Sequence, residues 1–169
     1  MSIKDDLAPD QWEKIAQAPF VAGFAVSAAD PSGLIGAFQE SSAMANSMQS
    51  SEEATIEGTL IHHIVEELRT SEGRRRIKDG LKEIIQGRDP ADASEAALLQ
   101  LGATMKLVAE HTPNEFRSLA DLVKSTAEKV AAAAKEGGFM GFGGVTISDA
   151  ERKTLSDIES VLAATVPVG

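Results

Sequence analysis

The chain has 169 residues, of which 43% are hydrophobic, 25% charged and 4% aromatic, and its formal net charge is −10. This composition excludes a disordered, collagen-like or multi-span membrane protein, and the length is typical of one domain. Cys is absent, which excludes disulfides, thiolate nucleophiles and Cys-based zinc sites. Frequent Ala and the absence of Tyr favour helices over a β-sandwich.

The N-terminal half, residues 1–90, has a less regular helical pattern than the rest of the chain. Its uncharged run from Ile15 to Ala29 is too short for a membrane span, which needs about 20 residues, and is read as buried core. We expect a short helix from Pro9, a second opened by Pro19, and a turn at Asp30–Gly33. Further helical faces are predicted over residues 34–48, 56–68 and 77–85.

The C-terminal half, residues 91–169, carries three helix-start signals. They are Asp92-Ala93-Ser94-Glu95, Thr112-Pro113-Asn114-Glu115 and Ser148-Asp149-Ala150-Glu151, the last two reading as capping boxes. Apolar residues recur at helical spacing after each, and Gly137-Gly138 ends the second of these helices. The prediction is an all-α, single compact bundle of about seven or eight helices spanning residues 1–169.

Charge and targeting signals bear on location and partners. The acidic N-terminus is not a signal peptide, so a cytoplasmic protein is the expectation. Residues 69–88 carry seven basic and three acidic side chains, whereas the flanking regions are acidic. We expect this basic stretch to balance the acidic N-terminal half or to support a homo-oligomer, and we expect no nucleic acid as a partner.

Two groups of residues are candidate sites from their chemistry. Asp30 and Glu40, around a turn, either hold a hard cation such as Ca²⁺ or Mg²⁺ or simply shape the turn. The glycine-rich loop 137–147 carries Phe139, Met140 and Phe142, which either pack onto the core or bind a partner. It lacks the Lys-Ser or Lys-Thr ending of a phosphate-binding loop, so nucleotide binding is not expected.

A third group supports a different function, that of a ferritin-like, metal-dependent bundle enzyme. Its ligands would be His62, His63, Glu66 and Glu67, joined by Glu40 or Glu110. The spacing occurs once and in reversed order, so a solvated helix face is the competing interpretation. Nucleophile elbows and His-Glu-x-x-His motifs are absent from the sequence, which favours a non-enzymatic protein.

Two segments together resemble the TerB-like tellurite-resistance family of small helical proteins. The first runs from Phe20 to Asp30 and continues to Gly33, Ile35 and Glu40; the second joins Val130–Ala134 to Gly143-Gly144-Val145-Thr146-Ile147-Ser148-Asp149-Ala150-Glu151. The resemblance implies a stress-linked interaction module. It also implies that any divalent cation would be held by Asp30, Glu40, Asp149 and Glu151.

Overall fold

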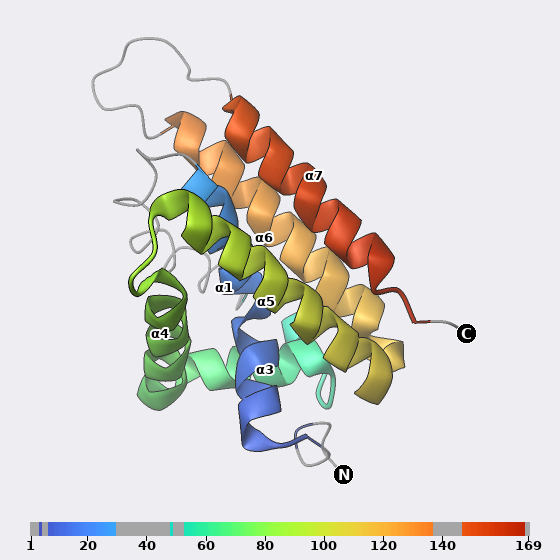
Figure 1. Cartoon of the computed structure of the whole chain (residues 1–169). Helices are drawn as coiled ribbons and strands as arrows, with labels where there is room; N and C mark the ends of the chain where they lie inside the picture. The colour runs from blue at the N-terminus through green and yellow to red at the C-terminus, as the bar shows by residue number, and fades with distance from the viewer. Residues whose placement is uncertain (1–3, 5–6, 30–47, 49–52, 137–146, 168–169) are drawn as a thin grey trace.

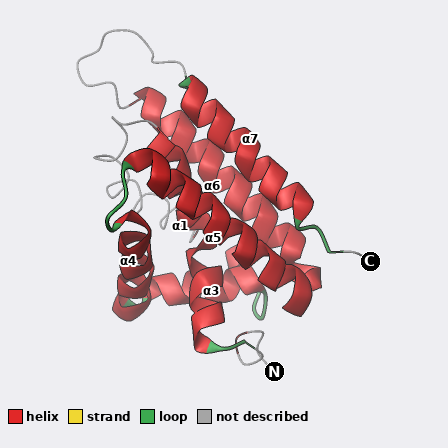
Figure 2. Cartoon of the chain, viewed as in Figure 1, coloured by secondary structure: helices red, strands yellow, loops and turns green. Residues whose placement is uncertain are grey.

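The architecture was obtained as a computed structural model that describes residues 4, 7–29, 48, 53–136 and 147–167. These residues form α1 (Pro9–Ala29), α3 (Leu60–Arg69), α4 (Ser71–Ile85), α5 (Pro90–His111), α6 (Phe116–Glu136) and α7 (Asp149–Ala164). Two short 3₁₀ turns, η2 (Glu53–Thr55) and η3 (Pro113–Glu115), complete them. Only helices and loops occur in these described ranges (Figure 2), so the all-α class is confirmed.

The helix count is lower than predicted, with six α-helices in the described residues instead of seven or eight. One reason is Pro19, which was expected to open a new helix but lies inside α1. Proline removes one backbone hydrogen bond from a helix interior. Apolar packing around α1 offsets that loss, because Pro19 and its neighbours are buried. The helix expected over residues 34–48 lies outside the described residues apart from Met48, which is helical and buried.

Helix α1 is the centre of the domain. Every residue from Ile15 to Ala28 is buried, which confirms that this uncharged run is core. A helix that is apolar on all sides must be covered on all sides, and α1 packs chiefly against α5 and α6, with α4 and α7 also in contact. Of the helices described here, none is long and apolar enough to cross a membrane.

Helices α5, α6 and α7 run side by side over the central helix (Figure 1). Apolar faces of α5 and α6 supply the buried residues Leu101, Met105, Leu119 and Val123. A buried hydroxyl also joins α5 to α1, because the Oγ of Ser94 donates a 2.8 Å hydrogen bond to the carbonyl of Ala25. The buried residues of α1 include Ala16, Ala22, Ala25 and Ala28, and such short side chains permit a close approach of helices.

Helices α3 and α4 meet at a tight corner with Thr70 as the single residue between them. Thr70 Oγ1 accepts a 2.9 Å hydrogen bond from Gly73 N and donates one of 2.9 Å to the carbonyl of Glu67. Thr70 therefore caps the end of α3 and the start of α4 together. Helix α3 itself starts at Leu60, capped by Thr59, so Ile56 lies outside it and is 56% exposed.

The predicted helix starts had different outcomes. The capping box of Ser148 and Glu151 is confirmed, with both reciprocal hydrogen bonds present. Helix α5 begins at Pro90 with Asp89 as its cap, a few residues before the predicted start.

The box expected at Thr112–Glu115 is wrong. Thr112 makes no capping hydrogen bond with its side chain, and Pro113–Glu115 is a 3₁₀ turn ahead of α6. The carboxylate of Glu115 instead accepts a 3.2 Å hydrogen bond from the backbone N of Leu60. It thus satisfies an amide at the start of a helix distant in sequence.

Candidate functional site

The residues predicted to hold a cation divide into two pairs. Asp30 and Glu40 lie outside the described residues, as do Phe139, Met140 and Phe142 of the predicted partner-binding loop. The other pair sits at the start of α7. Asp149 is 97% exposed and forms an ion pair with Arg152, and Glu151 is 6% exposed with its carboxylate 2.8 Å from the backbone N of Ser148. The structure thus places Asp149 and Glu151 in helix capping and a local ion pair.

The histidines and glutamates considered as enzyme ligands do not converge. His62 Nδ1 lies 2.8 Å from the carbonyl of Ala54, and the His63 ring meets Trp12 edge-on with 6.4 Å between centroids. Glu66 pairs with Arg69, and Glu110, on α5, lies 4.0 Å from Lys106. Within the described part of the chain, no three His, Asp or Glu side chains are grouped so that they could hold a metal ion.

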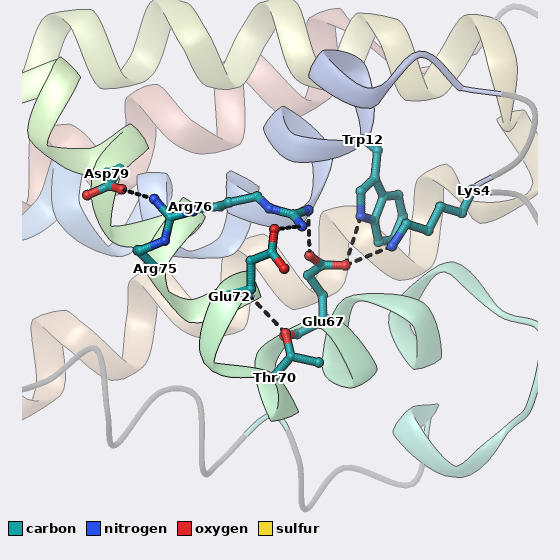
Figure 3. Close-up of polar contacts among 9 residues, drawn as sticks. Lys4, Trp12, Glu67, Thr70, Glu72, Arg75, Arg76 and Asp79 are labelled. Carbon is teal, nitrogen blue, oxygen red and sulfur yellow. Dashed lines mark hydrogen bonds and ion pairs between the residues drawn. The ribbon is translucent and has the colours of Figure 1, made fainter.

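Glu67 is instead the centre of a polar cluster that ties four parts of the chain together. Its side chain is 11% exposed and lies between Arg76 on one side and Trp12 and Lys4 on the other (Figure 3). The carboxylate accepts hydrogen bonds from Lys4 Nζ at 2.8 Å, Trp12 Nε1 at 3.3 Å and Arg76 Nη1 at 3.0 Å. Arg76 also donates to Glu72 at 2.7 Å.

The electrostatics of the Glu67 cluster favour the ionised carboxylate. Burial alone raises the pKa of Glu67, but the hydrogen bonds from Lys4 and Trp12 and the charges of Lys4 and Arg76 outweigh burial. The net pKa is therefore lowered from its ordinary value. Because its three donors come from different parts of the chain, the carboxylate links the N-terminal segment, α1, α3 and α4.

The basic side chains of residues 69–88 bind largely to groups on α3 and α4. Arg74 donates to the carbonyls of Leu68 and Arg69 at the end of α3, and Arg88 donates to the carbonyls of Glu83 and Ile84 at the end of α4. Basic side chains at helix C-termini satisfy carbonyls that lack helical partners. Two further cations are paired with Asp79, namely Arg75 at 3.4 Å and Lys82 at 3.1 Å.

An open groove between α6 and α7 is a surface feature suited to binding. It lies where the start of α6 meets the end of α7, near the C-terminal end of the chain (Figure 1), and has a volume of about 760 Å³. Apolar side chains make up most of its walls, and four charged side chains also line it. The apolar lining residues are Pro113, Phe116, Ala120, Leu162, Ala163, Val166 and Pro167, and the charged ones are Arg117, Asp121, Lys124 and Glu159.

An ion pair joins the two helices that line the groove. Lys124 Nζ on α6 lies 2.7 Å from Glu159 Oε1 on α7. The hydrogen bond to Glu159 and its negative charge raise the pKa of Lys124, which stays protonated. A second hollow of about 260 Å³ lies along the same two helices, and Lys124 and Glu159 line both hollows.

This groove is not apparent from the sequence. Phe116, Ala120 and Leu162 recur at helical apolar spacing in the sequence, which favours burial, and Phe116 and Leu162 are 6% and 8% exposed. One signal was available, because Val166 is an apolar residue beyond the last helical face and is 58% exposed. The hollow itself depends on how α6 and α7 pack together, which periodicity does not encode.

Comparison with known proteins returned no match to a family model, to a curated protein or to a solved structure. The resemblance to TerB-like proteins therefore stays a prediction, and the function has to be argued from the geometry of the chain.

Proposed function

We propose that this protein is a non-enzymatic interaction module that binds a helical segment of a protein partner in the α6–α7 groove. The observation that carries the proposal is the groove itself, which is open to solvent, has largely apolar walls and carries charged side chains. Grooves of this kind bind the apolar face of an amphipathic helix, while charges at the edge set its orientation.

The chemistry of the lining residues supports a protein ligand. Phe116 is one of the lining residues, and aromatic residues contribute strongly to protein interfaces. The exposed Val166 and Ala163 add apolar contact area that water covers in the isolated chain.

The stress-linked role that the TerB-like resemblance implies belongs to this proposal as its biological setting. A divalent cation is not part of it, since Asp149 and Glu151 are engaged at the start of α7. The metal-dependent enzyme gains no support either, since its proposed ligands within the described residues are bound to other partners.

Site-specific photo-crosslinking in the native cell tests the proposal. A photoreactive phenylalanine analogue replaces Ala163, which lines the groove, or Ala103, an exposed control on α5. We expect a discrete crosslinked protein product from position 163 only, and we expect Val166→Asp to abolish it. The absence of a product, or one that is equal at both positions and insensitive to Val166→Asp, would refute the proposal.

A further inference from the structure

We infer that the segment bound in the α6–α7 groove belongs to a second copy of this chain, docked about a two-fold axis. This inference rests on the proposed function and assigns its partner. It follows from the charges at the groove, from two charged side chains on α6 that have no ion-pair partner in the described residues, and from the exposed apolar residues around them.

The local charge at the groove favours a second copy of this chain. With a net charge of −10, two copies of the chain repel one another over most of their surfaces. The groove is an exception, because its four charged lining residues are two cations, Arg117 and Lys124, and two anions, Asp121 and Glu159. Two copies can therefore meet at the groove without like-charge repulsion between these residues.

The pattern of ion pairing at the groove also favours a second copy. Lys124 and Glu159 are already paired with each other. Arg117 and Asp121 are exposed, stand four residues apart on α6, and form no ion pair within 4.0 Å with any residue of the described segments. The charge of Asp121 does contribute to the raised pKa of Lys124.

Two-fold symmetry satisfies these charges without any other protein. In an isologous contact, residue i of one copy meets residue j of the other and the reverse contact forms as well. When two α6 helices meet antiparallel about an axis between positions 117 and 121, Arg117 faces the partner's Asp121. Asp121 then faces the partner's Arg117, so one contact type occurs twice.

Exposed apolar surface at the groove favours a second copy as well. Val166 is 58% exposed, and Ala163 and Pro113 are also exposed. A second copy brings the same three residues to the contact and so removes apolar area from water on both sides. Exposed apolar patches with charged edges are typical of such interfaces.

Charge reversal tests the inference on the full chain. We expect a concentration-dependent dimer in sedimentation equilibrium, and we expect Arg117→Asp or Asp121→Arg alone to weaken it at least ~10-fold, since each change sets like charges together twice. The double variant Arg117→Asp/Asp121→Arg restores complementary pairs and should recover the dimer. An equimolar mixture of the two single variants should likewise form a heterodimer.

A matched control has the same spacing on another helix. Lys106 and Glu110 are exposed and four residues apart on α5, so Lys106→Glu/Glu110→Lys should leave the dimer unchanged. Circular dichroism establishes that each variant is folded. A dimer that is insensitive to both single reversals, or a double variant that stays dissociated, would overturn the inference.

Failure of this inference is distinguishable from failure of the proposed function. A chain that stays monomeric at all concentrations, yet crosslinks from position 163 to a different protein, refutes the second copy and leaves the interaction role standing. A monomer that also gives no crosslink refutes both.

Discussion

Replacement of Gly73 by Ala tests the corner between α3 and α4. Gly73 is buried in the first turn of α4, and its backbone N donates to Thr70 Oγ1. A Cβ added at Gly73 would lie 2.8 Å from both the carbonyl carbon and the Cγ of Glu67, and closer still to the carbonyl oxygen. That oxygen already accepts hydrogen bonds from the N and Oγ1 of Thr70, at 3.1 and 2.9 Å. Because the obstacle is backbone, no side-chain rotation relieves it.

The expected magnitude follows from opposing terms. Ala is favoured over Gly inside a helix by up to ~1 kcal/mol. Against this, forcing a methyl group into a packed site costs about 1–3 kcal/mol, and disturbing the Thr70 cap costs about 1 kcal/mol more. We therefore expect Gly73→Ala to lower the free energy of unfolding by roughly 1–3 kcal/mol.

Gly102 provides the matched control for this substitution. It lies inside α5, and a Cβ there would be 3.5 Å from Val161 Cγ1, which is an ordinary van der Waals distance. Gly102→Ala should consequently raise the free energy of unfolding by about 0.5–1 kcal/mol. Urea unfolding followed by far-UV circular dichroism measures both variants. If Gly73→Ala proves as stable as the unmodified chain, the close approach at the corner is not as described.

Two further predictions concern α1 and the Glu67 cluster. A Cβ at Gly80 would lie 2.5 Å from Cδ of Gln17, so Gly80→Ala should destabilise the fold, and should do so less when Gln17→Ala removes the obstacle. A double-mutant cycle should show a coupling energy of ~0.5–3 kcal/mol between the two substitutions, and strict additivity would contradict the contact. The pKa of Glu67 is lowered from 4.5, so its contribution to stability is present above that pH and lost as the pH falls through the lower folded value. The free energy of unfolding, measured with urea, should therefore fall less between neutral pH and pH ~3 in Glu67→Gln than in the unmodified chain. Glu128→Gln, at an exposed position, should leave that fall unchanged.

Much of the fold could be predicted because its signals are local. The capping box of Ser148 and Glu151 joins groups three residues apart, so four consecutive residues specify it. The buried run of α1 follows from composition, since an uncharged apolar helix has to be covered by its neighbours. The all-α class needs only helical periodicity, which each segment carries independently.

The candidate site was not predictable in the same way. His63 and Glu67 read as a pair of ligands from spacing alone, but Glu67 is bound by Lys4, Trp12 and Arg76, which come from other parts of the chain. The groove likewise needs α6 and α7 to meet in one particular register.

The sequence by itself determined the helical class, the buried character of α1 and the capped start of α7, because each depends on residues within one or two turns of a helix. Only the tertiary structure decided that Pro19 stays inside a helix, that Glu115 caps Leu60, and that Phe116 and Val166 line one groove. These features join residues whose proximity is set by how whole helices pack, and packing depends on the shape of every buried side chain at once.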